Sequence, residues 1–266
     1  MLRLECILTT AAQYFDSGYV PTVNTIVEIE SCKAHAAPTS ATYCLFGSSA
    51  KDNVDAEQTN FAFYNSLSSN CAKFQLFTPY YYITTSVVPH YNPYRKMKIQ
   101  MDRYGVREIQ YVQEGTPYEY TSKTFPMATF SPYHEITTPS TYSLYFGALN
   151  VAGTAKYHTY SNIYGITILE KDSTGQAIVK KKYVPVLRGT VAGFYEEVEK
   201  KFIPSATSTP FKAGSILYPY GTVSTDSSDT VHTLTNLITS NNLGNTTPYS
   251  VSGNPITYTS SNSTLG

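Results

Sequence analysis

The feature of this 266-residue chain that most constrains its fold is an alternation of apolar and polar side chains, repeated in many short segments. In residues 25–31, Val27 and Ile29 alternate with Glu28 and Glu30. A period of two residues places successive side chains on opposite faces of a β-strand. The pattern recurs in residues 2–8, 25–31, 42–47, 60–64, 73–77, 80–85, 96–101, 106–112, 143–149, 163–170 and 177–184. In the first segment, Leu2, Leu4, Cys6 and Leu8 are expected to share the buried face.

Turn residues separate these segments, and almost no window has helical periodicity. Residues 16–18 (DSG), 89–93 (PHYNP) and 172–175 (DSTG) are typical of turns. The last of these turns lies within the predicted hairpin of residues 166–184. The 25 Tyr and 12 Phe residues also favour strands. We therefore predict an all-β protein, an antiparallel β-sandwich or jelly roll.

Composition divides the chain into residues 1–214, the predicted sandwich, and residues 215–266, a polar C-terminal arm. About half of the arm is Ser, Thr or Asn, and its only charged residues are Asp226 and Asp229. Asp229 could cap a short helix with an apolar face that docks onto another subunit. The alternative is a flexible tail. The residues of this candidate interface are Val231, Leu234, Leu237 and Ile238.

The charge balance argues against a general nucleic-acid binder. The chain has 19 basic and 19 acidic residues, whereas affinity for a duplex comes largely from clustered Lys and Arg. The one basic run, residues 180–182 (KKK), is read as a solvated strand edge rather than a phosphate contact. No apolar stretch reaches the ~20 residues of a membrane span, and residues 1–8 do not have the pattern of a signal peptide.

The four cysteines lie in the first third of the chain and match no zinc pattern. Two disulfides in an oxidising compartment and buried free thiols are both open readings. The cysteines are Cys6, Cys32, Cys44 and Cys71.

Four stretches, taken in chain order, resemble concanavalin A-like (laminin-G-like) jelly-roll domains. They are AQYFDSGYVPT with NTIVEI (residues 12–22 and 24–29), YCLFG (43–47), LYFGALN (144–150) and VPVLRGTVAGFYE continuing to FKAG (184–196 and 211–214). The similarity covers about residues 2–214, and its closing motif is the most specific part. The family tends to have Asp where this chain has Glu196, and because Glu is longer, the geometry of that turn is open.

Such domains occur in structural proteins of phages that infect gut Bacteroidales and in surface proteins of those bacteria. The resemblance implies that residues 184–202 form strands joined by turns, although the charged run after Tyr195 alone suggests a helix. Val184–Leu187 should end one strand, Gly193–Tyr195 should enter the next, and Lys201–Ile203 should resume pairing. Arg188 is expected to be structural, paired with a carboxylate or with backbone carbonyls.

Several glycosidases share this fold, so the carboxylates decide whether catalysis is expected. A retaining glycosidase holds two carboxylates about 5 Å apart. Glu28 and Glu30 share one face of a strand, but a solvated outer face is the simpler explanation. The histidines are single and scattered, and nucleophile-elbow, P-loop and dinucleotide motifs are missing. We predict a protein that is not an enzyme and that has no cofactor.

Two sets of residues are candidate ligand sites. The first set is aromatic and could stack on sugar rings or contact another protein: Tyr80, Tyr82, Tyr91 and Tyr94. The second set offers oxygen ligands for Ca²⁺ from one loop: Asp52, Asn53, Asp55 and Glu57. This loop lacks the glycine of a dedicated calcium loop.

These features favour a non-enzymatic phage structural protein, either a capsid decoration protein or another accessory virion subunit held by its C-terminal arm. It would be made in the host cytoplasm and carried in the virion. Its partners would be other virion proteins or copies of itself, without nucleic acid or membrane. The alternative is a carbohydrate-binding adhesion or receptor-binding module of a phage tail or bacterial surface, whose partners are glycans.

Overall fold

The described part of the protein consists of strands and their connections, with no helical residue among the residues described. The computed structural model describes residues 1–10, 12–33, 42–50, 60–66, 71–76, 80–84, 96–103, 105–110, 122–126, 140–217, 223–225, 231–233, 247–251 and 254–258. The predicted all-β class is confirmed. No helix in those residues is long and apolar enough to cross a membrane.

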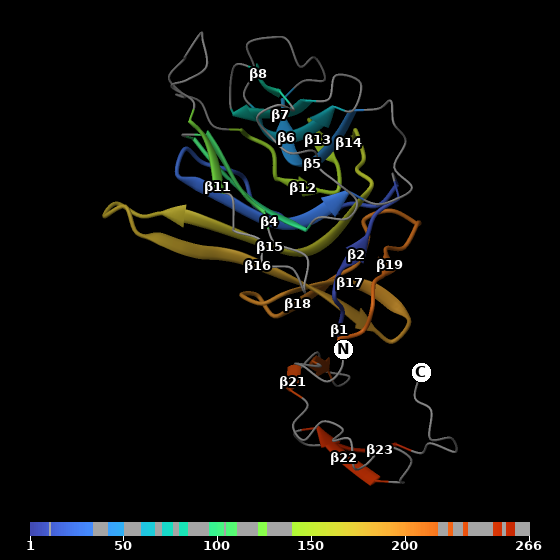
Figure 1. Ribbon diagram of the computed structural model, residues 1–266. Helices are drawn as coiled ribbons and strands as arrows, with labels where there is room; N and C mark the ends of the chain where they lie inside the picture. Colours follow the sequence, from blue (N-terminus) through green and yellow to red (C-terminus); the bar gives the residue numbers. More distant parts are fainter. Residues whose placement is uncertain are drawn as a thin grey trace.

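Two large sheets form a sandwich (Figure 1), and each contains strands that are distant in sequence. The path through the 11-stranded sheet is β11-β10-β9-β4-β15-β16-β17-β18, with β1, β2 and β19 at its side. Its strands are β1 (Leu2–Arg3), β2 (Ile7–Leu8), β4 (Thr25–Lys33), β9 (Met97–Asp102), β10 (Gly105–Gln110), β11 (Ser122–Pro126), β15 (Ser161–Lys171), β16 (Ala177–Arg188), β17 (Val191–Glu196), β18 (Lys201–Ile203) and β19 (Lys212–Ala213).

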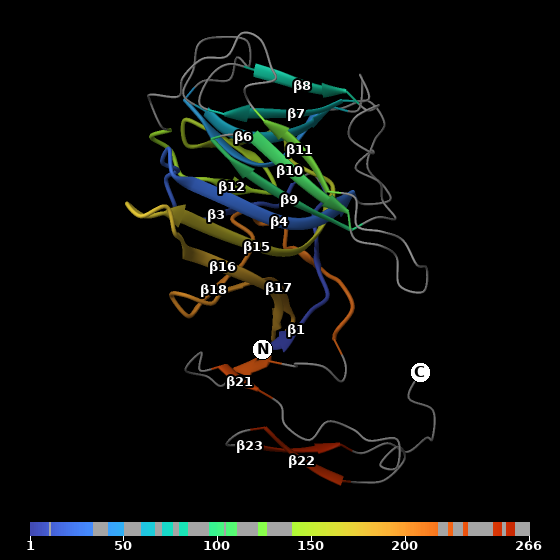
Figure 2. The same ribbon diagram turned by 60° about the vertical axis from the view of Figure 1, so that its left-hand side comes forward.

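The 8-stranded sheet lies over the first, and both views of the ribbon place β7 and β8 farthest from β16 (Figure 2). Its main path is β14-β13-β5-β6-β7-β8, and β12 links β3 to β5. Pairing is antiparallel except between β13 and β5. Its strands are β3 (Phe15–Asp16), β5 (Thr42–Ser49), β6 (Asn60–Ser66), β7 (Cys71–Leu76), β8 (Tyr80–Thr84), β12 (Tyr145–Phe146), β13 (Leu149–Val151) and β14 (Thr154–Lys156).

The core lies between the sheets and is built from the apolar half of each alternating strand. Val27 and Ile29 of β4 are fully buried, whereas Glu28 and Glu30 point outward. On β15 the buried apolar residues are Ile163, Ile166 and Ile168. Three positions separate the first two, whereas strict alternation would give two. A register shift between Ile163 and Gly165 supplies the extra residue, which keeps all three isoleucines on the core face.

The predicted strands are confirmed over the residues that the structure describes, with two exceptions. Residues 143–149 form two strands, β12 and β13, because Gly147 has φ +92° and a side chain there would meet the Gln13 carbonyl oxygen at 2.8 Å. The alternation predicted for residues 2–8 is wrong. Leu4, Cys6 and Ile7 are buried, but Leu8 is only half-buried. The segment is broken into β1 and β2, so its period of two does not persist through residues 4–6.

The interpretation of residues 184–202 is confirmed. β16 ends at Arg188, Gly189 turns the chain with φ +59°, and β17 then carries the buried Phe194 and Tyr195. The Arg188 guanidinium lies over the Phe202 ring at 5.6 Å from its centroid, a cation–π contact that the sequence did not suggest.

The described segments of the C-terminal arm include short strands. β20 (Val223–Thr225) pairs with β21 (Val231–Thr233), and β22 (Thr247–Val251) pairs with β23 (Asn254–Tyr258). The helix predicted after Asp229 is therefore wrong for residues 231–233, where Val231 is the first residue of β21. Leu234, Leu237 and Ile238 lie outside the described residues.

Gly193 offers a test of the closing motif. A Cβ at this position would lie 2.6 Å from the Ile203 carbonyl oxygen and 2.7 Å from the Phe202 ring. We expect Gly193→Ala to lower the free energy of unfolding by about 1–3 kcal/mol, because β18 would have to move away. The matched control is Gly165→Ala, whose Cβ would find its nearest neighbour at 3.8 Å. Urea unfolding measures both, and equal effects would contradict the close approach of β17 and β18.

Candidate functional site

The candidate ligand residues predicted from sequence fall mostly outside the part of the chain that the structure describes. Tyr80 and Tyr82 are in strand β8, but only its backbone is described. Tyr91 and Tyr94 lie outside the described residues, as do all four oxygen ligands of the candidate calcium loop, Asp52, Asn53, Asp55 and Glu57. Both sets therefore stay predictions. Within the described residues, no group of three or more His, Cys, Asp or Glu side chains could hold a metal ion.

The two carboxylates that could have suggested catalysis lie in cross-strand ion pairs. On the outward face of β4, Glu28 pairs with Lys98 at 2.6 Å and Glu30 pairs with Lys96 at 2.8 Å. Gln100 also donates to Glu28 Oε1 at 2.8 Å. All four charged side chains are partly exposed. This is the arrangement of a solvated sheet face, in which each carboxylate is paired with a lysine of the neighbouring strand.

The basic run of residues 180–182 is also paired within the chain. Lys180 contacts Glu170 at 3.4 Å, Lys182 contacts Glu197 at 2.6 Å, and Lys181 pairs with Glu199. Hydrogen bonding from Lys181 lowers the pKa of Glu199 below its ordinary value. The run lies at a strand edge, as predicted, and its charge is balanced locally.

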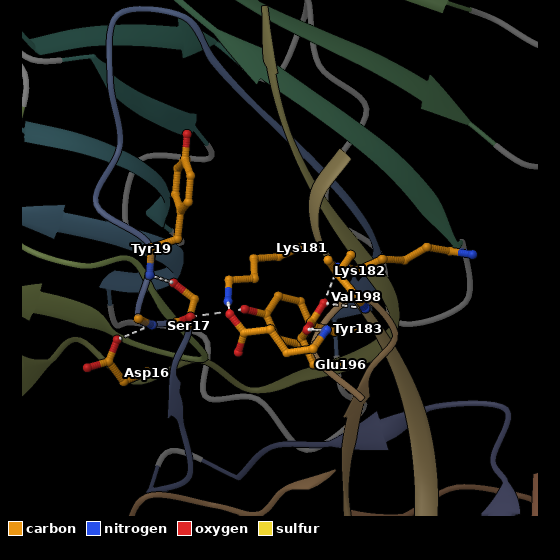
Figure 3. Close-up of polar contacts among 10 residues, drawn as sticks. Asp16, Ser17, Tyr19, Lys181, Lys182, Tyr183, Glu196 and Val198 are labelled. Carbon is orange, nitrogen blue, oxygen red and sulfur yellow. Dashed lines mark hydrogen bonds and ion pairs between the residues drawn. The ribbon is translucent and has the colours of Figure 1, made fainter. Parts of the chain in front are cut away.

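The most buried carboxylate of the described residues belongs to Glu196, which exposes 1% of its surface. Its Oε1 accepts hydrogen bonds from the backbone N–H groups of Lys182, at 2.9 Å, and Val198, at 3.0 Å (Figure 3). Its Oε2 accepts one from the Glu199 N–H. The carboxylate therefore closes the turn between β17 and β18 and fastens it to β16. The sequence left the geometry of this turn open, and the structure shows that the Glu196 side chain is long enough to close it.

The opening motif has a structural role as well. Asp16 accepts from the Gly18 N–H at 2.8 Å, while the Ser17 hydroxyl donates to the Leu144 carbonyl at 2.8 Å and accepts from the Tyr19 N–H at 3.1 Å. The Tyr183 hydroxyl crosses the core to donate to the Ser17 carbonyl at 3.2 Å (Figure 3). Burial, with Glu196 nearby, raises the pKa of Tyr183. Through these bonds the motif links the segment after β3 to the segment before β12 and to β16 of the other sheet.

Three cysteines are buried free thiols, so the second of the two open readings holds for them. Cys6, Cys32 and Cys44 are all buried and unpaired with one another. Burial raises the pKa of Cys6 to about 12, and it also raises the pKa of Cys32 and Cys44. Thiols that stay protonated are poor nucleophiles. Only the backbone of Cys71 is described.

A partly exposed aromatic cluster is the feature of the described residues best suited to a ligand. Tyr14 stacks on Tyr145 with ring centroids 4.8 Å apart and an angle of 26° between the planes. The His158 ring lies beside the Tyr14 ring, with centroids 5.7 Å apart and planes tilted by 60°. Tyr14 and His158 are half-buried, and Tyr145 is buried. We call these three residues the Tyr14 cluster.

Polar groups border the Tyr14 cluster. The Tyr145 hydroxyl donates to the Gly153 carbonyl at 3.4 Å, and Asn150 closes the adjoining β13–β14 turn by accepting from the Gly153 N–H at 2.7 Å. His158 Nδ1 is buried and has no hydrogen-bond partner among the residues that the structure describes. Burial lowers the pKa of His158, so the imidazole is neutral at pH 7. A neutral imidazole can donate from one nitrogen and accept at the other.

Sequence reasoning missed this cluster. Its residues come from three separate segments, before β3, in β12 and after β14, and none has a spacing that relates it to the others. The resemblance did include Tyr14 and Tyr145 in its quoted motifs. It gave no reason to place their rings against each other, or to add His158.

Comparisons with known proteins give structural similarity only. Neither known protein-family models nor curated protein sequences match this chain. Among solved structures, the CBM40 carbohydrate-binding module of the Ruminococcus gnavus IT-sialidase aligns at a TM-score of 0.40 and 12% identity, over 62% of this chain and 89% of that one. The same module bound to α2,3-sialyllactose aligns with the same score and identity. The K499G mutant of the NanB sialidase from Streptococcus pneumoniae aligns at a TM-score of 0.37 and 12% identity, over 79% of this chain and 39% of that one.

Glu196 allows the structural reading of the closing motif to be tested. Glu196→Gln replaces one of its acceptor oxygens with an NH₂ group that would face a backbone N–H. We expect a loss of about 1–3 kcal/mol in the free energy of unfolding, because a buried donor then lacks an acceptor. The control is Glu199→Gln, which alters an exposed ion pair and should have a smaller effect. Denaturant titration at pH 7 compares them, and a larger loss in Glu199→Gln would refute the assignment.

Proposed function

We propose that this protein is a non-catalytic carbohydrate-binding module and that the Tyr14 cluster is its sugar-contacting surface. The observation that carries the proposal is the stacked Tyr14–Tyr145 pair with its neighbouring imidazole. Tyrosine rings present a flat apolar face beside a polar hydroxyl group. A pyranose ring has matching properties, since its C–H groups lie on one face and its hydroxyl groups lie around the rim.

The surroundings of the cluster fit the polar rim of such a ligand. His158 is neutral because burial lowers its pKa, and its Nδ1 has no partner within the described part of the chain. An unpaired buried polar atom is costly, and native structures seldom retain one without a reason. Because this nitrogen is buried, a sugar hydroxyl would reach it only after the imidazole turns outward, and an enclosed water molecule would satisfy it in the free protein. Tyr145, stacked against Tyr14 and hydrogen-bonded to Gly153, supports the half-buried ring of Tyr14.

The carboxylates support binding without turnover. Glu28 and Glu30 are held by lysines on the outward face of β4, and Glu196 is used to close a turn. None of these carboxylates is among the contacts of the Tyr14 cluster. Hydrolysis of an oligosaccharide that was lost in Glu28→Gln or Glu30→Gln would contradict the non-catalytic part of the proposal.

A glycan array with the full-length protein tests the binding part. We expect binding to at least one glycan, and a loss of affinity of tenfold or more in Tyr14→Ala. Loss of one stacked aromatic face removes about 1–3 kcal/mol in comparable ring-stacking contacts. The matched control is Tyr14→Phe, which keeps the ring and should keep most of the affinity. Titration calorimetry with the best glycan of the array measures all three proteins.

Two outcomes would contradict the assignment of the site. Silence on the array would refute carbohydrate binding by this chain. Binding that survives in Tyr14→Ala but is lost in a Tyr91→Ala/Tyr94→Ala double variant would move the site to the loop that the sequence singled out.

A second function, accessory subunit of a phage virion, is favoured by the pairing of the C-terminal arm. Among the described strands, β20 and β21 pair only with each other, as do β22 and β23. A two-stranded hairpin is marginally stable by itself in water. β20 also lies against β1 of the sandwich, so it is the hairpin of β22 and β23 that would gain stability by docking on a partner surface. Another virion protein or a further copy of this chain would supply one. Synthesis in the host cytoplasm and incorporation into particles belong to the same proposal.

Truncation after Leu217 tests the arm. This end point keeps the Leu217 N–H bonded to the Arg3 carbonyl at 3.1 Å, so the sandwich should retain its stability. We expect the truncated protein to fold with an unchanged melting temperature but to be missing from purified particles, as measured by mass spectrometry with copy number. Normal incorporation of the truncated protein would contradict the role of the arm.

A further inference from the structure

The segment between β14 and β15 leads from one sheet of the sandwich to the other and carries His158 of the Tyr14 cluster. The Tyr157 carbonyl accepts from the Cys44 N–H of β5 at 2.7 Å, which ties the start of the segment to the 8-stranded sheet. Ser161 then begins β15 of the 11-stranded sheet. His158 therefore lies at the start of a continuous path from the Tyr14 cluster to β15.

The side chains along this path alternate between the interior and the surface. Thr159 and Ser161 are buried, and their hydroxyl groups hydrogen-bond to each other at 2.7 Å. Thr9 fixes this backbone, because its hydroxyl accepts from the Ser161 N–H at 3.0 Å and donates to the Thr159 carbonyl at 3.0 Å. Since Thr159, Ser161 and Ile163 point inward, the residues between and beside them point outward. We call this half-buried outward set the 158–164 row; it consists of His158, Tyr160, Asn162 and Tyr164.

Aromatic rings recur along the 158–164 row. The Tyr160 ring meets the buried Tyr43 ring edge-on, with centroids 5.3 Å apart and 72° between the planes. At the far end, the Lys96 ammonium group lies over the Tyr164 ring at 4.6 Å from its centroid. At the near end, His158 packs in the Tyr14 cluster. The Tyr14 cluster is therefore one end of a longer row of rings.

The 158–164 row also holds polar atoms that lack partners. Among the described residues, three buried side-chain nitrogen or oxygen atoms have no hydrogen-bond partner, and two of them, His158 Nδ1 and Asn162 Oδ1, belong to this row. Tyr160 lies between these two residues. Both side chains are half-buried, so each can expose its unpaired atom by turning about χ2. Native structures seldom leave such atoms unpaired without a reason.

We propose that the Tyr14 cluster and the 158–164 row form one extended site for a chain of sugars, with one sugar unit on Tyr14 and the next on Tyr160. This inference rests on the carbohydrate-binding function proposed above. At the rise of an extended strand, residues 158 to 162 span about 13 Å, which is longer than a single pyranose ring. A chain of sugars repeats an apolar ring face between polar hydroxyl groups, and the row offers the same order in Tyr160 between His158 and Asn162. The class of ligand is thus an oligosaccharide rather than a single terminal sugar.

The dependence of affinity on chain length tests the extended site in the wild-type protein. The probes are the glycan that binds best on the array and its shortened forms of one, two and three sugar units from the non-reducing end. We expect the trisaccharide to bind about tenfold or more tighter than the monosaccharide, because the second unit adds a stacked ring. Titration calorimetry with the full-length protein measures each form. Equal affinity of all forms would overturn the extended site and leave the proposed function intact.

Tyr160→Ala locates the second position of the site. We expect this variant to lose the gain from chain length, so that the trisaccharide binds no tighter than the monosaccharide, while the monosaccharide keeps its wild-type affinity. Tyr14→Ala should instead weaken every form. The matched control is Thr167→Ala, because Thr167 is a half-buried residue of the same strand between the buried Ile166 and Ile168, beyond the register shift. It should change neither affinity.

A second variant keeps the test decisive, because Tyr160 packs on the buried Tyr43 and its loss could disturb folding. Asn162→Ala leaves that ring pair in place, and we expect it to weaken the trisaccharide about threefold or more by removing one hydrogen-bonding group. Thermal unfolding of each variant shows whether it is folded. Trisaccharide affinity unchanged in both variants, or monosaccharide and trisaccharide affinity falling equally in a folded Tyr160→Ala, would overturn the extended site alone. Silence on the array would overturn the proposed function and this inference with it.

Discussion

The packing of Phe15 holds the two sheets together. Its ring lies 5.3 Å from Phe146 of the 8-stranded sheet, and 5.0 and 4.9 Å from Tyr183 and Phe194 of the 11-stranded sheet. Phe146 in turn contacts Phe46 at 5.8 Å. Each such pair adds about 0.5–1.5 kcal/mol beyond the area it buries. Because its ring packs on both layers, Phe15 connects β3 and β12 of one sheet with β16 and β17 of the other.

The sequence was most informative where one side of a strand is buried and the other is solvated. Val27 and Ile29 against Glu28 and Glu30 gave both the strand and its orientation, because the period of two records burial directly. It was misleading at residues 2–8, since the chain breaks into two short strands and Ile7 takes the core position expected for Leu8. The break depends on pairing with β15, β16 and β19, which lie more than 150 residues away and leave no local pattern.

The candidate site was not predictable for a related reason. The motifs that resemble concanavalin A-like domains are those that build turns and close the sandwich, as Ser17, Gly193 and Glu196 show. These residues identify a fold because fold-specific backbone geometry requires them. The Tyr14 cluster is assembled by the sandwich from three segments, and stacking between rings has no sequence period. In this chain, the residues that specify the sandwich and the residues proposed to contact a ligand are therefore separate sets.

The positions of β1 and β2 also affect how the chain can fold during synthesis. These strands leave the ribosome well before their partners, because β1 pairs with β16, and β2 pairs with β15 and β19. Leu4 and Ile7 therefore stay uncovered until residues 161–213 have emerged. Contacts between such distant residues make folding slow, and exposed strands in a nascent chain are open to wrong pairing. The same contacts fasten the two ends of the finished sandwich together, so neither end can detach without opening the 11-stranded sheet.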